Sequence, residues 1–393
     1  MTVDFVKLHE SKKAELLQQA QDLNIDDPTK LRKSDLVFAV AQAQATQPLG
    51  RGILEVHGEG FGFLRTPTNN FLPGPGDIYV SQSQIRRFRL RTGDTVIGQI
   101  RAPKEGERYP ALLRVEAVNG DPPGLEAPSF DMLTAIYPDE RLSLGGGAIL
   151  SAVQRIAPMG FGQRGLLVAP ARTGKVELLR ALTETFVKDE ELEITVLLLD
   201  ERPEEIQEWR TNTTAEVIAT PFDETAARHL QVADITFERA RRMAERGDDV
   251  VLLVDSLTRL LRACLSELPP SGRTLSGVDS TALHRIRHYM GAARALEEGG
   301  SLTVIGVISG DTNGRAPQAL MENLQEVVNW ELTLSRDLAD RGISPPIDVQ
   351  RSGTRREERL LKEDELAELR KWRQGLTGDV FEDAQRLMKS VKS

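Results

Sequence analysis

The chain has 393 residues, of which 40% are hydrophobic and 28% charged, and its formal net charge at pH 7 is −9. This length allows two or three domains with cores of their own, whereas no apolar run approaches the roughly 20 residues of a membrane helix. The single cysteine, Cys264, excludes an internal disulfide framework and a cysteine-based zinc site, and five scattered histidines do not form a metal site. The N-terminus lacks the apolar stretch of a secretory signal, so we expect a cytoplasmic protein without a membrane partner.

Residues 1–48 are predicted to form a small helical subdomain. Apolar residues from Leu16 to Leu23 recur at helical spacing, Pro28 ends that run, and a second helix is expected to begin near Ser34. Two roles remain open for this subdomain. It is either a packing unit without chemistry of its own or a weak contributor to nucleic-acid binding.

Residues 49–118 change to short β-rich segments separated by Gly, Pro and Asn turns, with about five strands in 70 residues. That pattern is typical of a small barrel of the oligonucleotide-binding (OB-fold) or cold-shock type. The Pro- and Gly-rich stretch 119–145 is predicted to be a linker.

The charge of the chain is concentrated unevenly between these parts. Between Arg51 and Glu116 there are ten Lys or Arg and seven Asp or Glu, so this segment carries +3 and the remainder −12. A basic module on an acidic body can bind a polyanion locally. The overall negative charge therefore does not exclude a nucleic-acid partner.

Residues 146–393 alternate between apolar runs of strand length, such as GLLVA, ITVLLLD and VVLLVD, and helical segments, notably 174–187 and 223–246. Near-continuous apolar strands that alternate with helices predict an α/β domain with a buried, mostly parallel sheet.

Aromatic residues in the predicted barrel are candidates for nucleic-acid binding. Phe61, Phe63 and Arg65 are spaced to share one strand face, and Tyr79 and Tyr109 come from other segments. Exposed rings stack on unpaired bases and arginines pair with phosphates, so the group fits a single-stranded ligand. The alternative is that these rings are core residues.

The segment APARTGKV follows an apolar strand and precedes a predicted helix, the context of a phosphate-binding loop. Backbone N–H groups at the helix N-terminus would hold phosphates, and Lys175 would reach the terminal ones. Such loops normally end in Gly-Lys-Ser or Gly-Lys-Thr, whereas here the last residue is Val176.

Two further apolar strands end in acids. Asp255 closes VVLLVD, as a carboxylate that orients magnesium would. Asp200, Glu201 and Arg202 follow ITVLLL, where a carboxylate could polarise an attacking water. The alternative for each acid is ordinary capping of a strand end.

These residues together resemble the transcription termination factor Rho family, which are ring-shaped, hexameric, RNA-dependent ATPases and helicases of bacteria. The strings GFGFLR, LRTGDTV and PKEGERY are similar to the family's RNA-binding barrel, and LLLDERPEE, FDETAARH, LLVDSLTRL and RSGTRREE to its ATPase domain. The resemblance covers nearly the whole chain. It implies a RecA-like P-loop ATPase domain, ATP and Mg²⁺ as ligands, single-stranded RNA as partner, RNA polymerase as indirect partner, and a ring that is a homohexamer or a mixed ring with another Rho.

The resemblance also implies roles for individual residues. Catalytic roles would fall to Lys175, Glu201, Asp255 and Arg355, with Asp255 at the magnesium site and Arg355 acting across a subunit interface on a neighbour's phosphates. The implied nucleotide-binding residues are Gly160, Phe161, Gly162, Gln163, Arg164, Gly165, Arg172, Thr173, Gly174, Lys175, Val176, Glu177 and Arg202. The implied RNA-binding residues are Gly60, Phe61, Gly62, Phe63, Leu64, Arg65, Asp77, Ile78, Tyr79, Glu107, Arg108 and Tyr109 in the barrel, with Arg273, Thr274, Leu275, Ser276, Gly277 and Gln325 in the pore.

The sequence departs from the family at the phosphate loop. Val176 stands where the family has a threonine whose hydroxyl binds the magnesium ion, and Arg172-Thr173 replaces Lys-Ala. Losing such a charge-stabilising contact commonly costs about 10²–10³ in rate.

The pore segments also differ. The family's Phe-Lys-Gly-Thr-Gly-Asn corresponds to Leu324–Asn329, LQEVVN, in which Gln325 replaces the lysine and Glu326 adds a negative charge. The other pore loop, 271–279, is one glycine shorter. Gly342 stands where a second arginine is expected, with Arg341 adjacent.

Three hypotheses follow. The first is a Rho-type termination factor that binds nascent single-stranded RNA and uses ATP to translocate along it and release transcripts. The second is a hydrolysis-impaired Rho-like regulator that acts by occupying RNA, favoured by Val176 and Leu324–Asn329. The third is a metabolic ring ATPase without RNA, disfavoured by GFGFLR and PKEGERY. Whether the protein hydrolyses ATP is therefore left open by the sequence.

Overall fold

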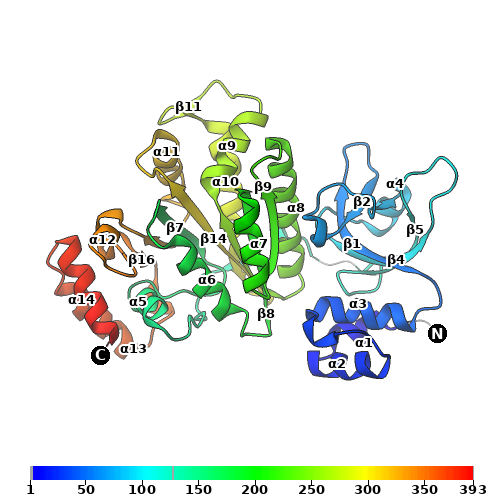
Figure 1. Ribbon diagram of the computed structural model, residues 1–393, viewed down its shortest axis with the longest axis horizontal. Coiled ribbons are helices and arrows are strands. Elements are labelled where there is room, and N and C mark those ends of the chain that lie inside the picture. Colours follow the sequence, from blue (N-terminus) through cyan, green and yellow to red (C-terminus); the bar gives the residue numbers. More distant parts are fainter. Residues whose placement is uncertain (1–2, 126–127, 393) are drawn as a thin grey trace. The chain divides into compact units, whose positions relative to one another are not determined.

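The computed structural model describes residues 3–125 and 128–392. The chain forms two compact units: unit 1 is Met1–Pro128 with Asp234–Arg242, and unit 2 is Ser129–Ala233 with Met243–Ser393 (Figure 1). None of the described helices is long and apolar enough to span a membrane.

Unit 1 begins with the predicted helices, α1 (Phe5–Glu10), α2 (Lys13–Asp22) and α3 (Lys33–Gln44). Leu16 and Leu36 are fully buried between them. Their cluster also includes Leu49 and Ile97 from the strands that follow, so helices and strands of unit 1 share apolar contacts. The helical interpretation of this region is confirmed.

The strands of unit 1 close into a five-stranded barrel in the order β1-β2-β3-β5-β4. They are β1 (Leu49–Val56), β2 (Gly62–Arg65), β3 (Ile78–Val80), β4 (Thr95–Arg101) and β5 (Ala111–Val118). Alternate residues such as Leu54, Leu64, Val80 and Val96 fill the interior. The predicted OB-like barrel is therefore confirmed.

One predicted β-rich segment is only partly a strand. After β3 the chain forms helix α4 (Gln82–Phe88). Ser81 begins this helix because its hydroxyl accepts from the N–H of Gln84 while the Gln84 amide oxygen accepts from the N–H of Ser81. This capping box, with Gln at the third helical position, outweighs the β propensity of the residues before it.

Unit 2 is built on a nine-stranded sheet whose main path is β16-β15-β7-β14-β10-β8-β9. Neighbours from β15 to β9 are parallel, and strands β10 and β14 are buried over nearly their whole length, so both faces are covered. The strands are β7 (Arg164–Pro170), β8 (Leu192–Glu201), β9 (Glu216–Pro221), β10 (Asp249–Asp255), β14 (Ser301–Gly310), β15 (Trp330–Thr333) and β16 (Gly353–Thr354), with β6 (Ala135–Ile136) and β13 (Arg294–Leu296) beside β14.

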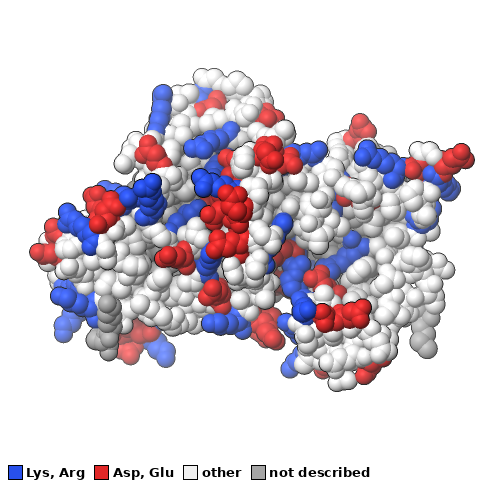
Figure 2. All heavy atoms as spheres, in the orientation of Figure 1, with Lys and Arg blue, Asp and Glu red and all other residues white. Residues whose placement is uncertain are grey.

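Helices connect and flank these strands. They are α5 (Ala148–Ile156), α6 (Lys175–Phe186), α7 (Pro203–Asn212), α8 (Ala226–Ala244), α9 (Leu257–Glu267), α10 (Ser280–Gly291), α11 (Arg315–Leu324), α12 (Arg336–Asp340), α13 (Glu363–Gln374) and α14 (Val380–Lys392). Several of them, such as α6 and α9, bury apolar side chains. Figure 2 shows acidic side chains gathered on the face of unit 2 where α7 lies; this helix carries Glu204, Glu205 and Glu208. The predicted α/β architecture is confirmed.

The second half of the predicted linker 119–145 is part of unit 2. Strand β6 pairs with β13, and Phe130, Leu142 and Leu144 are buried. Pro and Gly marked the irregular backbone of this stretch correctly, but the leucines between them pack into the core.

Candidate nucleotide and RNA sites

The phosphate-binding loop lies where the sequence predicts it, between the end of β7 and the start of α6. Arg172 and Gly174 both have positive φ, 61° and 76°, which turns the chain sharply into the helix. The first N–H groups of α6 therefore face the space beyond the carboxyl end of a parallel sheet, where an anion is favoured. Thr173 donates its hydroxyl proton to the Pro170 carbonyl at 2.7 Å, which steadies the turn.

Lys175 and Asp255 meet at this loop. The Lys175 ammonium lies 2.5 Å from Oδ2 of Asp255, and the Asp255 side chain at the end of β10 is almost completely buried. The other oxygen, Oδ1, is buried and has no hydrogen-bond partner among the described residues. An unpartnered carboxylate oxygen beside a phosphate loop fits a role in holding a nucleotide-bound cation through water.

The chain offers only part of a magnesium site. No group of three or more His, Cys, Asp or Glu in the described residues could hold a metal. Val176 has no oxygen, and the Thr173 hydroxyl already bonds to Pro170. Asp255 therefore fits an ion that arrives with the phosphates, while the ligand normally supplied by the loop's last residue is missing.

Glu201 ends β8 and is held by Arg259, a residue of α9 that sequence reasoning missed. The Arg259 guanidinium contacts both carboxylate oxygens, at 2.5 and 3.2 Å. Burial by itself would raise the pKa of the Glu201 carboxyl, but the bonds and charge of Arg259 outweigh burial, and the pKa lies below its usual value. The available signal was DSLTR, in which Ser256 caps α9 and Arg259 lies in the first turn of that helix, four residues after the strand-end acid Asp255.

Residues Gly160–Gly165 do not lie at the phosphate loop of their own chain. They lie before β7 or at its start, whereas the phosphate loop follows its end. A strand of seven residues is about 20 Å long. Gln163 is buried and its amide oxygen accepts from the Gly160 N–H at 3.0 Å, while the Arg164 guanidinium donates to the Val327 and Ala293 carbonyls. Within one subunit these residues therefore do not join the phosphate loop, and their role in nucleotide binding stays a prediction.

Arg355 lies on that same distant side. The backbone N–H groups of Arg164 and Arg355 both donate to Asn329, which directly precedes β15. Burial first, and then the charges of Arg294 and Arg355, lower the pKa of the Arg164 guanidinium. The phosphate loop and Arg355 therefore lie at opposite ends of β7 within one chain.

The barrel carries an aromatic patch, which we define as His57, Phe61, Phe63, Tyr79 and Tyr109. Its ring centroids lie 5.1–5.9 Å apart, and each ring is partly exposed. The core interpretation of these rings is wrong, because the barrel interior is filled by aliphatic side chains instead. Sequence reasoning missed His57, whose N–H donates to the Phe61 carbonyl across the turn between β1 and β2.

Arg65 does not face a ligand, contrary to expectation. Its side chain is 3% exposed and forms ion pairs with Asp77 and with Glu55, the latter at 2.6 Å. The guanidinium lies 4.9 Å from the Phe63 ring centre and so supports the aromatic patch from beneath. A buried arginine needs such partners, and these carboxylates leave it little capacity to bind phosphates.

Four other residues implied for RNA binding serve the barrel. Leu64 and Ile78 are core residues. Gly62 is buried, and a Cβ there would lie 2.6 Å from the Glu55 carbonyl oxygen, so glycine is needed for the pairing of β1 with β2. Gly60 has a φ of 88° and makes the turn that brings Phe61 to the patch.

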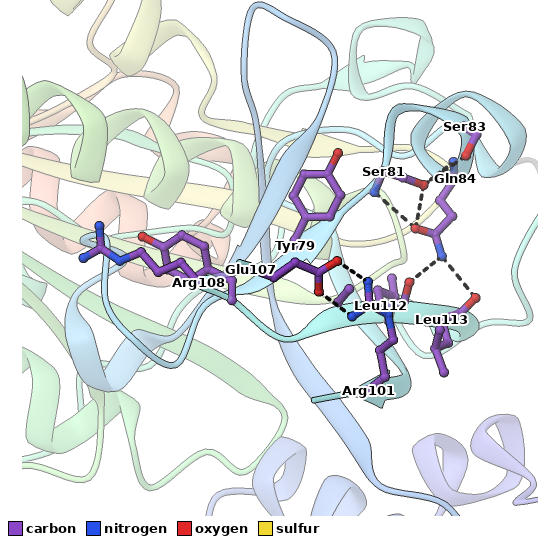
Figure 3. Close-up of a pocket in the computed structure, with 11 residues that line it drawn as sticks. Tyr79, Ser81, Ser83, Gln84, Arg101, Glu107, Arg108, Leu112 and Leu113 are labelled. Atoms are coloured by element: carbon purple, nitrogen blue, oxygen red, sulfur yellow. Dashed lines mark hydrogen bonds and ion pairs between the residues drawn. The ribbon is translucent and has the colours of Figure 1, made fainter. Parts of the chain in front are cut away.

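A pocket of about 640 Å³ opens beside Tyr79 and Tyr109 (Figure 3). Figure 3 shows the Glu107 carboxylate held by the Arg101 guanidinium, with the two bonds at 2.5 and 2.8 Å. Hydrogen bonds from Arg101, and then from the Lys104 N–H, lower the pKa of Glu107 to about 2. Arg101 and Gln84 line this pocket and were not predicted from the sequence.

The residues predicted for the pore occupy two segments of unit 2. Arg273, Thr274 and Leu275 are exposed on a hairpin formed by β11 (Thr274–Leu275) and β12 (Val278–Asp279). Ser276 at its tip donates its hydroxyl proton to Glu322 of α11, and the Arg315 guanidinium donates to the Ser276 carbonyl at 3.1 Å.

The second pore segment follows α11. The Gln325 carbonyl accepts from the Arg355 guanidinium at 2.6 Å. The Glu326 side chain is 81% exposed and lies 3.6 Å from the Arg287 guanidinium, while Val328 is buried. Near the phosphate loop, Arg341 stacks on Phe381 with 5.0 Å between its guanidinium carbon and the ring centre.

An OB-like barrel with exposed rings, joined to a parallel sheet with a phosphate loop, defines a nucleotide-binding protein with RecA-like architecture. Solved structures with this fold include a type III secretion system ATPase (TM-score 0.54, 18% identity, covering 67% of this chain and 88% of that one) and the ATP synthase subunit NeqB of Nanoarchaeum equitans (TM-score 0.53, 14% identity, 70% and 81%).

Sequence comparison identifies the family. Residues 50–124 match the Rho termination factor RNA-binding domain, 8–48 the Rho termination factor N-terminal domain, and 150–354 the nucleotide-binding domain of the ATP synthase alpha/beta family. Transcription termination factor Rho is 43% identical over 377 residues in Pseudomonas aeruginosa (93% of this chain, 90% of the relative) and 42% identical over 380 residues in Escherichia coli K12 (93% and 91%). The chain belongs to the transcription termination factor Rho family.

Proposed function

We propose that this protein is a transcription termination factor that captures nascent single-stranded RNA on its barrel and uses ATP to translocate along it and release transcripts. The observation that carries this proposal is the presence, in one chain of this family, of an exposed aromatic patch and a phosphate loop. The first suits unpaired bases and the second suits a nucleoside triphosphate.

RNA capture would depend on Phe61, Phe63 and Tyr79. Their partly exposed rings offer stacking surfaces, each worth about 1–3 kcal/mol per base. The adjoining pocket adds the Glu107 carboxylate, which is fixed by Arg101 and can accept from a base amino group. Arg108 is exposed and suits a backbone phosphate.

At the nucleotide site, the N–H groups of the loop and of the first turn of α6 would hold the phosphates. Lys175 would exchange its contact with Asp255 for the terminal phosphates, leaving both Asp255 oxygens available. A bound magnesium ion would neutralise charge on the phosphates. Glu201 would accept the proton of the attacking water, and for this its carboxylate has to loosen from Arg259.

Ring assembly is supported by the distance between the phosphate loop and Arg355 within one chain. Arg164 and Arg355 lie at the start of β7, and the phosphate loop follows the other end of this strand, about 20 Å away. A side chain cannot bridge that distance, so Arg355 would act on the nucleotide of a neighbouring subunit. We propose a ring of copies of this chain, alone or with another Rho, acting on RNA polymerase in the cytoplasm.

Transcript release from purified bacterial elongation complexes tests this function. With ATP, Mg²⁺ and the protein, labelled RNA should leave the complex, and Lys175→Ala should leave it bound because the phosphates lose their cation. Equal retention of RNA with the wild-type protein and with Lys175→Ala would contradict the termination function.

The second candidate is a regulator that binds RNA without effective hydrolysis. It is favoured by Val176, which provides no magnesium ligand, and by Glu326, which adds negative charge to a pore segment.

Restoring the ligand separates the two candidates. We expect Val176→Thr to raise Mg²⁺-dependent ATP turnover by at least tenfold and by as much as about 10²–10³, the range associated with such contacts, while Val176→Ala, which also lacks oxygen, stays near wild type. Wild-type turnover that Val176→Thr does not increase would show that water replaces the missing hydroxyl and that the loop is not the limiting defect.

A further inference from the structure

A cavity of about 250 Å³ lies beside the phosphate loop. Its apolar walls come from α5, α6, the residue after β15 and the segment after α12, namely Ile149, Leu178, Leu334, Ile343, Pro345 and Pro346. Apolar walls next to a triphosphate site suit a nucleobase. With the base in the cavity and the phosphates at the loop, the sugar of the nucleotide would lie between the two.

One acidic side chain lines this cavity. Glu177 lies in the first turn of α6, two residues after Lys175, and its side chain is exposed. Its Oε2 atom lies 3.5 Å from the position that a Cβ on Gly174 would occupy, so the carboxylate leans back over the loop. Among the described residues the Glu177 side chain makes no hydrogen bond or ion pair.

An unpaired carboxylate at this position is electrostatically unfavourable for a polyphosphate unless the ligand also donates hydrogen bonds to it. Its place at a helix N-terminus explains why the free protein tolerates the charge, but not why it faces the cavity. The donors nearest to the phosphates of a nucleotide are the hydroxyl groups of its ribose. Carboxylates recognise these hydroxyls in other nucleotide-binding folds.

We propose that the Glu177 carboxylate accepts hydrogen bonds from the ribose hydroxyls of the bound nucleotide and makes this site selective for ribonucleotides over deoxyribonucleotides. This inference rests on the proposed binding of a nucleoside triphosphate at the loop. It assigns Glu177 to sugar recognition, separate from magnesium and from the phosphates, which Asp255 and Lys175 serve.

Calorimetric titration of the full chain with ATP, 2′-deoxy-ATP, 3′-deoxy-ATP and GTP tests the assignment. The wild-type protein should bind ATP roughly tenfold or more tightly than at least one deoxy analogue, the range of a hydrogen bond to a charged group. Glu177→Gln should lose most of that preference and leave the ratio of ATP to GTP affinity unchanged. Glu184→Gln, an exposed acid two turns further along α6, is the matched control and should behave like wild type.

Each other outcome overturns the assignment in a distinguishable way. Equal preference for ATP over the deoxy analogues in wild type and Glu177→Gln would remove Glu177 from sugar recognition. A changed ATP to GTP ratio would place the carboxylate at the base, and an effect that disappears in EDTA would place it at the metal. If the wild-type protein binds no nucleotide, whereas RNA binding is intact, nucleotide binding itself fails, and the Glu177 assignment with it.

Discussion

Charged side chains are arranged in opposite ways in the aromatic patch of unit 1 and in the pore segments of unit 2. On the barrel, the ion pairs of Arg65 are buried beneath the patch, and the rings above remain partly exposed. In the pore segments, exposed polar groups are bonded to neighbours of the same subunit: Ser276 to Glu322, and Arg287 to Glu326. The barrel is thus arranged to bind bases, while the pore segments satisfy their polar groups internally. The two groups of residues expected to contact RNA therefore differ in how their polar side chains are satisfied, and they can diverge separately.

The largest expected effect is on the free energy of unfolding and comes from Arg65, which is buried beneath the patch. Arg65→Ala would leave the carboxylates of Asp77 and Glu55 without their cation, and removing one partner of a buried pair destabilises by roughly 3–5 kcal/mol. Chemical denaturation followed by barrel-specific signals should show this loss. Arg114→Ala, an exposed arginine of β5, should change the free energy of unfolding by less than about 0.5 kcal/mol. Equal stability of the two variants would mean that the Arg65 pairs contribute little.

The next effect concerns the rings themselves. Phe63→Ala should weaken binding of an oligo-C RNA by about 1–3 kcal/mol. The Phe63 ring lies at the centre of the patch, because its centroid is within 5.9 Å of the centroid of each of the other four rings. Fluorescence anisotropy measures this loss. Tyr137→Ala, an exposed ring of unit 2, should leave the affinity unchanged. If both variants bind like wild type, the patch does not stack bases.

A smaller effect is expected in the pore segments. Glu326→Gln removes an exposed ion pair with Arg287, so the free energy of unfolding should change by less than about 0.5 kcal/mol. RNA stimulation of ATP turnover should nevertheless increase, because a negative charge that repels phosphates is lost. A variant with wild-type stimulation at every salt concentration would show that this segment does not face RNA.

The smallest effect is a pH dependence at the barrel pocket. Arg101 depresses the pKa of Glu107 to about 2, below its unfolded value near 4.5, so the contact stabilises above that unfolded value and is lost as pH falls towards 2. In Arg101→Gln, NMR titration of the Glu107 carboxyl should give a midpoint closer to 4.5. An unchanged midpoint would assign the low pKa to the backbone bond from Lys104 instead.

Much of this molecule was predictable because its signals are local. The phosphate loop is a contiguous motif between a strand and a helix. The end of β7 and the start of α6 therefore fix the position of Lys175. The aromatic patch was largely visible in GFGF. The correct barrel and sheet classes follow from strand length and apolar content.

The predictions differ from the structure where a residue's role depends on contacts with residues distant in the sequence or on the length of a strand. Arg65 was expected on the surface because its spacing matches Phe63, but it is buried in ion pairs with Glu55 of β1 and with Asp77, which directly precedes β3. Gly160–Gly165 are close to the loop in sequence, but a strand about 20 Å long separates them from it. Arg259 was missed because its partner, Glu201, lies 58 residues away in the sequence.

The decisive measurement of the proposed termination function is ATP hydrolysis by the purified protein with Mg²⁺, with and without poly-C RNA. We expect slow turnover that RNA stimulates, since the barrel keeps its exposed aromatic patch and the loop lacks only one magnesium ligand. Absence of turnover under both conditions, with oligo-C binding preserved, would contradict a translocating termination factor and identify the protein as one that acts by occupying RNA.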